Sequence, residues 1–398
     1  MLLDEPTTYL DIAHQLEVIE LVERLNREEG RTIVMVLHDL NEATRVSHHI
    51  VAMREGRIIR EGTPHEVVDP ALLHELYGIT CDIHAHPANA QPFCIPRSAA
   101  PTTRVAAAKS NDGFAMNGLQ TGYGRVTISR DLALELPAGQ VTAIIGPNAC
   151  GKSTLLRTCA RLLRPQGGTV CLNDQSIRRG SHRALASRLA LLAQGPIPPA
   201  GVLVEDLVAA GRIPHQHLFH QWRAGDETAL EGALDRCDLQ ALRYREVATL
   251  SGGQRQRAWF GMALAQETPV LLLDEPTTFL DIAAQIDLLG LARTLNREEG
   301  RTVVMILHDL NLAARYADRI VAMKAGEIVA IGTPAEVITV ALLREVFSIE
   351  ATILTDPQTG LPLVLPIRAI GTGEETVALS PEGSPHERQF AAAARLAS

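Results

Sequence analysis

Apolar runs alternate with amphipathic stretches along the middle of the chain. Residues 152–163 have helical character, and residues from about 202 to 249 follow a helical pattern (VEDLVAAGR, ETALEGALDRCDL). Short runs rich in leucine and β-branched residues lie between the helical stretches: QVTAIIG at 140–146, LALLAQ ending at 194, PVLLLDE at 269–275 and RTVVMILH at 301–308. Continuous apolar strands separated by helices predict a buried, mostly parallel sheet. The segment 202–249 is then an inserted helical subdomain.

The beginning of the chain repeats its later part. Asp4 aligns with Asp274 and His38 with His308, both at a spacing of 270, so the register holds without a gap. LNREEGRT and HDLN occur in both copies, and more than half of the first 80 positions are identical to their partners. Identity at this level indicates a duplication within the chain.

The apolar pattern weakens in two places. Pro, Ala, Ser and Asn accumulate from about residue 87 to 113, and the end of the chain after residue 367 is polar, with Gly, Pro and Ser. Such compositions are typical of linkers and disordered tails. We therefore assign residues 1–96 to a partial repeat, 97–118 to a linker, 119–367 to one complete α/β unit and 368–398 to a tail that we expect to be disordered.

Composition narrows the class of protein. The chain has 398 residues, 46% of them hydrophobic, and a net charge of −9, which gives no general electrostatic reason to bind nucleic acid or an anionic membrane. Its six cysteines form no CxxC pair, so neither a disulfide framework nor a zinc ribbon is indicated. The start MLLDEP lacks the pattern of a signal peptide, and no long apolar run predicts a membrane span. We expect a soluble, cytoplasmic protein.

The strongest chemical signal is the stretch GPNACGKST, which fits G-x-x-x-x-G-K-[ST] between a strand and a helix. Backbone N–H groups of such a loop face nucleotide phosphates. Lys152 should reach the β- and γ-phosphates, and the Ser153 hydroxyl should bind Mg²⁺. The predicted nucleotide-binding loop comprises Gly146, Pro147, Asn148, Ala149, Cys150, Gly151, Lys152, Ser153 and Thr154.

Two further motifs complete a nucleotide site. The apolar strand at 269–275 ends in Asp274, a predicted Mg²⁺ ligand, and Glu275, which would orient the attacking water. LSGGQRQR at 250–257 has Ser251 as a helix cap, and its two glycines allow a ligand to approach the backbone closely.

In this combination the chain resembles the ATP-binding subunit of an ABC transporter over all of 119 to about 367. The resemblance implies a P-loop NTPase fold with a mostly parallel sheet, an antiparallel β edge and an inserted helical subdomain, preceded here by a truncated α/β half-domain. It implies ATP and Mg²⁺ as ligands. The residues it places at the nucleotide, besides the loop, are Tyr123 on the adenine, the D-loop residue Asp281, and Ser251, Gly252, Gly253 and Gln254 of the signature. The catalytic residues it implies are Glu275, His308, Gln194 and Lys152, and the metal ligands are Ser153, Gln194 and Asp274.

The resemblance also implies partners. Two such domains pair head to tail, so that Ser251, Gly252 and Gly253 act on the ATP of the other subunit. We therefore expect a homodimer at the cytoplasmic face of the cell membrane, bound to transmembrane permease subunits and linked through them to a substrate-binding protein. GRIPHQ, TTFLDIAAQ and HDLNLAARYAD resemble ATPases of the iron–siderophore, haem and cobalamin importer group. Nucleic acid is not an expected partner.

One position departs from related sequences, which commonly have Gly where this chain has Ala149. Alanine is tolerable there unless its φ angle must be positive, in which case it costs about 1 kcal/mol. Such a cost would weaken nucleotide binding modestly.

The first copy contains Asp4, Glu5, Asp11 and His38 but no phosphate loop, adenine-stacking aromatic, Q-loop or signature. It should not bind ATP tightly alone, nor serve as the opposite half of an ATP sandwich. We favour a remnant of a tandem gene over a regulatory module, and a misplaced start would look the same. Either copy could pair with the strand leading into Gly146. We expect the second to do so, because it follows the signature helix directly.

Several other clusters and functions receive less weight. We expect surface positions rather than metal ligands at Cys81, His84, His86, His215, His217 and His220, a solvated face at Arg178 and Arg179, and structural or nucleotide-proximal roles for Arg255 and Arg257. The alternatives to a transporter subunit are a soluble ATPase acting on nucleic acid or ribosomes, and a nucleotide-binding regulator without turnover. Within the transporter class, haem, cobalamin or a metal are alternative cargoes.

Overall fold

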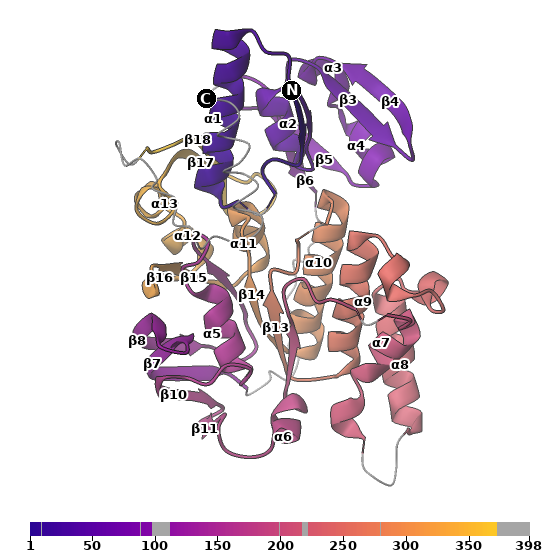
Figure 1. Cartoon of the computed structure of the whole chain (residues 1–398), viewed down its shortest axis with the longest axis vertical. Coiled ribbons are helices and arrows are strands. Elements are labelled where there is room, and N and C mark those ends of the chain that lie inside the picture. Colours follow the sequence, from indigo (N-terminus) through magenta and orange to yellow (C-terminus); the bar gives the residue numbers. More distant parts are fainter. Residues whose placement is uncertain are drawn as a thin grey trace.

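The computed structural model describes residues 1–8, 10–87, 89–97, 112–198, 200–216, 222–278 and 280–371. Two bodies of unequal size lie one against the other (Figure 1). We call residues 1–97 the first copy and residues 112–371 the complete unit. The predicted tail at 372–398 and most of the predicted linker lie outside the described residues.

A six-stranded sheet forms the centre of the complete unit. Its strand order is β12-β13-β14-β9-β15-β16, parallel except for the pair β15/β16. The strands are β9 (Val141–Ile145), β12 (Leu189–Leu192), β13 (Val270–Asp274), β14 (Thr302–Ile306), β15 (Arg319–Lys324) and β16 (Glu327–Gly332). Every residue of β9, β13 and β14 is buried, as expected for strands covered on both faces. The parallel sheet predicted from the sequence is confirmed.

A second sheet, antiparallel, flanks the phosphate-loop side. It contains β7 (Phe114–Tyr123), β8 (Val126–Leu136), β10 (Gly167–Leu172) and β11 (Gln175–Ser176) in the order β11-β10-β7-β8. Because β7 begins at Phe114, the boundary predicted at residue 119 is corrected to residue 112. Asp112 anchors this start through an ion pair with Arg188 at 2.5 Å and a bond from the Thr302 hydroxyl to its carbonyl at 2.8 Å.

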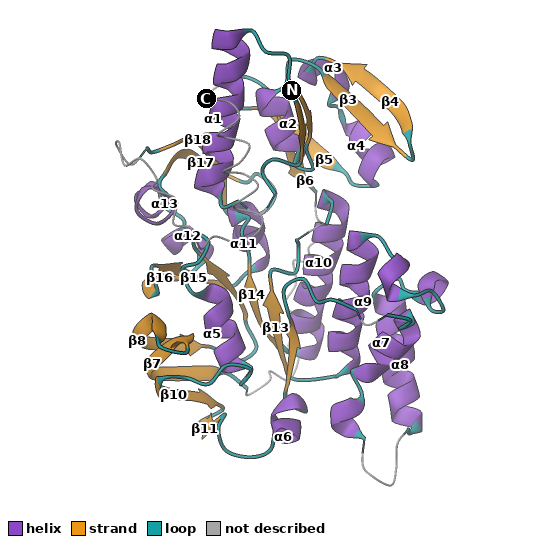
Figure 2. Cartoon of the chain, in the orientation of Figure 1, coloured by secondary structure: helices purple, strands orange, loops and turns teal. Residues whose placement is uncertain are grey.

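Helices cover both faces of the central sheet (Figure 2). One face packs under α5 (Lys152–Cys159) and the antiparallel sheet. The other face packs under the remaining large helices and the inserted subdomain. These and the smaller elements are α6 (His182–Ala186), α7 (Val204–Ala210), η1 (Ile213–His215), α8 (Ala224–Arg236), η2 (Gln240–Leu242), η3 (Val247–Thr249), α9 (Gly252–Ala265), α10 (Ile282–Glu299), α11 (Leu310–Tyr316), α12 (Pro334–Val337) and α13 (Val340–Phe347). The hairpin of β17 (Ile349–Thr355) and β18 (Pro362–Ala369) ends the unit two residues beyond the predicted 367.

The first copy folds with the element order of its repeat. Its elements are β1 (Leu2–Asp4), α1 (Ile12–Glu29), β2 (Val34–Val36), α2 (Leu40–Val46), β3 (Ile50–Arg54), β4 (Arg57–Gly62), α3 (Pro64–Val67), α4 (Pro70–Tyr77), β5 (Cys81–Ala85) and β6 (Pro92–Pro96). β6 lies inside the stretch 87–113 whose composition suggested a flexible linker, and this interpretation is corrected. The Asn41 side chain binds both the N–H and the carbonyl of Cys94 in β6, as Asn311 binds Val364 in β18.

The two copies pack through the same surface of each. Arg45 donates to the carbonyls of Pro366 and Ile367, and its repeat Arg315 donates to the carbonyl of Pro96 at 2.6 Å. The apolar seam is equally symmetric, since residue pairs 270 apart form it: Phe93 and Ile95 with Leu363 and Leu365. Reciprocal contacts between equivalent residues are the signature of a pseudo-two-fold interface.

Candidate active site

The phosphate loop turns sharply between β9 and α5. Gly146 and Gly151 have φ angles of 151° and 105°, and a Cβ atom at Gly146 would lie 2.2 Å from the carbonyl oxygen of Met323. Glycine is required at such positions because the backbone approaches its neighbour closely. The buried Lys152 ammonium donates to the carbonyls of Gly146 and Pro147 at 2.8 and 2.7 Å. The loop therefore holds a cation at the start of a helix, as phosphate binding requires.

Ala149 adopts the left-handed conformation, with a φ of 59°. This is the case in which alanine is strained, because its Cβ crowds the following carbonyl. We expect Ala149→Gly to stabilise the loop by up to about 1 kcal/mol, which tightens ATP binding by a factor of up to about five. ATP titration and thermal unfolding measure both effects. Ala160→Gly is the control, because Ala160 has an ordinary φ of −77° and glycine there gains nothing. Unchanged affinity in Ala149→Gly would contradict a strained loop.

Asp274 lies at the end of β13 beside the loop. The Ser153 hydroxyl donates to its Oδ1 at 2.7 Å. Its Oδ2 is buried and has no hydrogen-bond partner among the described residues, and Arg157 Nε lies 3.7 Å from it. Burial raises the pKa of the Asp274 carboxyl, and the Ser153 hydrogen bond only partly offsets this. An unpaired carboxylate oxygen beside a hydroxyl matches the hard oxygen ligands of Mg²⁺.

Two side chains that follow neighbouring strands of the sheet hold Glu275. His308 Nε2 lies 2.7 Å from its Oε1, and the Gln194 amide donates to its Oε2 at 2.5 Å. Burial alone would raise the pKa of the Glu275 carboxyl. The His308 hydrogen bond and the charges of His308 and Lys152 outweigh burial and lower it. Glu275 is therefore an ionised acceptor in a fixed orientation, suited to position a water.

The remaining predicted nucleotide residues lie farther apart. Tyr123 is exposed at the end of β7, with its hydroxyl 3.5 Å from Arg157. Ser251 caps α9 in a reciprocal capping box with Gln254, as its sequence pattern predicts. Among the described residues that line the cavity over the phosphate loop, none comes from the signature. In this chain the signature therefore does not face its own loop.

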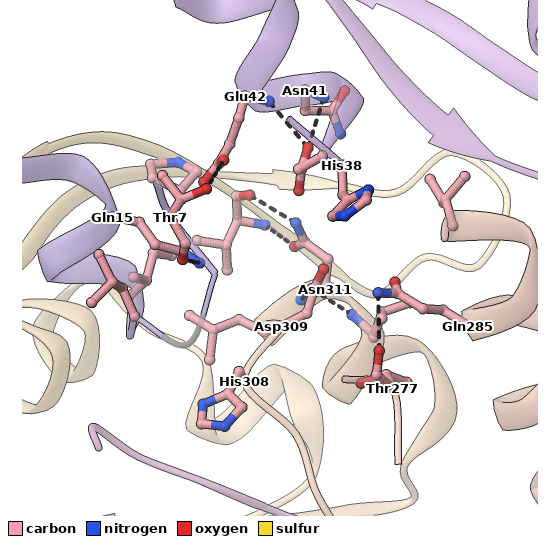
Figure 3. Close-up of a pocket in the computed structure, with 18 of the residues that line it drawn as sticks. Thr7, Gln15, His38, Asn41, Glu42, Thr277, Gln285, His308, Asp309 and Asn311 are labelled. Carbon is pink, nitrogen blue, oxygen red and sulfur yellow. Dashed lines mark hydrogen bonds between the residues drawn. The ribbon is translucent and has the colours of Figure 1, made fainter. Parts of the chain in front are cut away.

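A cavity of about 750 Å³ lies between the two copies beside the phosphate loop. Side chains of both copies face it (Figure 3). They are Thr7, Gln15, His38 and Glu42 from the first copy, and Thr277, Gln285, His308 and Asn311 from the complete unit. Asp11 of the first copy accepts a hydrogen bond from the Asn148 N–H at 3.2 Å. Asp11 also caps its own helix by accepting from the His14 N–H, as its repeat Asp281 does from the N–H of Ala284. The first copy thus contacts the nucleotide loop directly, which the sequence did not reveal.

Acidic groups meet across this cavity. Asp39 and Asp309 cap α2 and α11. They are open to the cavity yet surrounded by protein, which raises the pKa of both, and the charge of Asp39 adds to the rise at Asp309. Burial, and then the charge of Asp39, raise the pKa of Glu42 to about 7. The repeat of Glu42 is Leu312, so this acid belongs to the first copy alone.

The raised pKa of Glu42 predicts a pH-dependent stability of the first copy. The folded copy keeps the proton up to about pH 7, whereas the unfolded chain loses it near the ordinary 4.5. The stabilisation is therefore complete below the ordinary value and is lost as pH rises through about 7, by up to about 3 kcal/mol. Glu42→Leu should remove this dependence, measured by hydrogen exchange in α1 and α2 across this range. Glu17→Gln, on an exposed site of α1, should keep it. An unaltered dependence in Glu42→Leu would contradict this assignment.

The clusters given less weight divide between core and surface. Cys81 is buried, contrary to the expected surface position, whereas His84 is exposed and His86 half-buried. His215 binds the Gln266 carbonyl at 2.8 Å, and His217 and His220 lie outside the described residues. Arg178 and Arg179 are exposed as expected. Arg255 donates to the Leu250 carbonyl and Arg257 to the Asp238 carboxylate. Within the described ranges, no group of three or more His, Cys, Asp or Glu side chains could hold a metal ion.

Comparisons with known proteins agree with this geometry. The family described as "ABC transporter" matches residues 129–278. The ferric enterobactin transport ATP-binding protein FepC of Escherichia coli is 50% identical over 249 residues, which cover 63% of this chain and 92% of that protein. The chain belongs to the ABC transporter ATP-binding proteins.

Other relatives extend the match. The iron(3+)-hydroxamate import ATP-binding protein FhuC of Bacillus subtilis is 44% identical, with 66% of this chain and 99% of that protein covered. Among solved structures, an inward-facing putative metal-chelate type ABC transporter aligns with a TM-score of 0.56 and 27% identity, over 64% of this chain and 98% of that chain. The family match lies within the complete unit, and proteins of this family, including this chain, hydrolyse ATP. No described helix is long and apolar enough to cross a membrane.

Proposed function

We propose that this chain is the ATP-hydrolysing subunit of an ABC importer for an iron–siderophore-type cargo. The observation that carries the proposal is the network at the carboxyl ends of the central strands. There Lys152, Asp274 and Glu275 meet with His308 and Gln194. The cargo class rests on the names of the relatives. These are ATP-binding proteins for the transport of ferric enterobactin, of iron(3+)-hydroxamate and of another siderophore.

The residues of the site have separate roles in ATP binding and hydrolysis. The loop N–H groups and Lys152 bind the phosphates, and Tyr123 offers an exposed ring to the adenine. Glu275, kept ionised by His308, accepts a hydrogen bond from the attacking water and orients it toward the γ-phosphate. Gln194 and His308 fix the Glu275 carboxylate from both of its oxygens. When bound, Mg²⁺ neutralises charge on the phosphates, and Ser153, Asp274 and Gln194 are the side chains that would hold it.

The assembly completes the site from a second chain. Because Ser251 and its glycines do not line the cavity over their own loop, they are free to act on the ATP of a partner cassette. Such a homodimer would bind permease subunits at the cytoplasmic face of the membrane. A substrate-binding protein would deliver the cargo to those subunits.

Uptake in cells tests this function. A bacterial strain that lacks its siderophore ATPase, but keeps the permease and binding protein, should regain uptake of labelled iron–siderophore when it produces this chain. The Glu275→Gln variant, produced at the same level, should not restore uptake. Restoration of haem uptake alone would assign the chain to the haem group, which includes relatives about 40% identical. Association of the purified chain with nucleic acid at moderate salt, without uptake, would contradict the importer function.

A further inference from the structure

We propose that the first copy is a docking platform for the front half of a cassette, and that docking builds a second nucleotide site. The platform is the bare face of its strands, formed by Leu2, Val34, Val36, Val51 and Met53. The occupant is a polypeptide with a short apolar strand, a phosphate loop and an amphipathic helix. The proposal goes beyond the proposed function, on which it rests only for the identity of the nucleotide.

The exposure of the bare face contrasts with that of its repeat. Leu2, Val34 and Met53 are 83%, 58% and 60% exposed, whereas the equivalent residues of the complete unit are fully buried. Those equivalents, Leu272, Val304, Ile306, Val321 and Met323, pack against β9, α5 and the antiparallel sheet. By analogy with the complete unit, a strand, a helix and a sheet equivalent to β9, α5 and the antiparallel sheet would cover this face. Contiguous exposed apolar residues of this kind mark an interaction site.

Among the described residues of the first copy, no strand pairs with both β2 and β3. In the complete unit β9 lies between β14 and β15 and pairs with both in parallel. In the first copy β2 pairs only with β1 and β3 only with β4, as far as the described residues extend. The facing edges of β2 and β3 thus offer unpaired backbone groups to one inserted strand. Open edges accept a strand of suitable sequence by main-chain hydrogen bonding.

The platform is already folded on its other side. Ala52 of β3 is buried against Val67 of α3 and Leu72 of α4, so these two helices cover the opposite face of that strand. β1 and β2 keep the register of β13 and β14, with Asp4 opposite Val36 as Asp274 is opposite Ile306. The occupant therefore meets a preformed surface.

The catalytic carboxylate of the first copy is also in place. Glu5 has a φ of 46° and lies 2.5 Å from His38, close to the 52° and 2.7 Å of Glu275 and His308. Asp4 and Glu5 stand at the carboxyl edge of the bare strands, where Glu5 forms an ion pair with His38 and neither carboxylate forms one with a lysine of the described residues. A phosphate loop brings the complementary cation. Charge therefore favours this occupant over an uncharged apolar segment or a lipid surface.

Binding is tested on the full chain carrying Lys152→Ala, which disables its own nucleotide loop. The probes are a purified polypeptide of residues 112–268 of this chain and a peptide of residues 138–163. Either probe should bind the full chain, as measured by fluorescence anisotropy. Val36→Lys should weaken binding at least tenfold, because it places a charge in the covered face. Leu21→Lys, at an exposed position of α1, is the matched control and should bind normally.

The second site is tested with a fluorescent ATP analogue and the longer probe. The complex with Lys152→Ala should bind one analogue, and Asp4→Ala should abolish this binding whereas Asp274→Ala should not. Dependence on Asp274 instead would mean that the probe replaces the resident front half, which overturns the proposal. So would failure of both probes to bind, equal binding by Val36→Lys, or Val36-dependent binding to phosphatidylcholine vesicles instead. ATP hydrolysis by the unmutated chain, measured separately, reports on the proposed function alone.

Discussion

Replacing Glu275 by glutamine is expected to slow ATP hydrolysis by a factor of about 10² to 10⁴ while ATP still binds. Glutamine keeps the size of the side chain and can still contact His308 and Gln194. It loses the negative charge that His308 and Lys152 stabilise and with which the carboxylate orients water. Phosphate release measures the rate, and a fluorescent nucleotide measures binding.

The repeat supplies a matched control for this variant. Glu5 has the same backbone conformation as Glu275 and the same histidine contact, but it is Glu275 whose carboxylate is stabilised by the charge of Lys152 in the phosphate loop. Glu5→Gln should therefore leave the rate unchanged. A similar loss of rate in both variants would contradict the assignment of hydrolysis to the complete unit.

Replacing Lys152 by alanine is expected to weaken ATP binding by a factor of about 10 to 10³, because charged hydrogen bonds to phosphate are lost. The ammonium is buried within the loop, where it contacts two backbone carbonyls. In the variant those carbonyls face the phosphates without an intervening cation. Calorimetric titration with ATP measures the effect.

Lys324→Ala is the control for the lysine variant. Lys324 ends β15 with an exposed side chain that donates to the Glu345 carbonyl. Its removal should leave ATP affinity unchanged. Full affinity in Lys152→Ala would show that the loop does not bind phosphate as described here.

The sequence predicted the cassette because its signals are local. The phosphate loop needs Gly146, Lys152 and Ser153 in fixed order, and the strand ending in Asp274 is apolar throughout. The fold of the first copy could likewise be predicted from the repeat, because similar sequences in the two copies form the same helices and strands. Motifs of this kind can be recognised in the sequence without knowledge of the tertiary structure.

The relation between the copies could not be predicted. No motif in the sequence includes Arg45 or Arg315 as a contact residue, but each donates to a carbonyl of the other copy. Asp11 resembles an ordinary helix cap, yet it also accepts from Asn148. The strand β6 was hidden because Pro92 and Pro96 suggested a linker, although a proline can occupy the end of an edge strand. Such contacts depend on how the first copy packs against the complete unit, and this packing leaves no periodic pattern in the sequence.

The docked first copy has a consequence for assembly. It lies on the cavity over the phosphate loop, where the proposed homodimer would place the signature of a second chain. The two arrangements compete for the same side of the loop. Turnover by the homodimer then requires the first copy to move away, and the pseudo-two-fold contacts at Arg45 and Arg315 are those that break.

The most direct test of this account compares steady-state ATP hydrolysis by the full chain with that of a shortened chain beginning at Asn111. If residues 112–371 contain all of the ATP chemistry, the shortened chain hydrolyses ATP at least as fast as the full chain, and faster if the first copy obstructs pairing. A shortened chain that folds normally by circular dichroism but does not hydrolyse ATP would contradict it, because the first copy would then be part of the catalytic machinery.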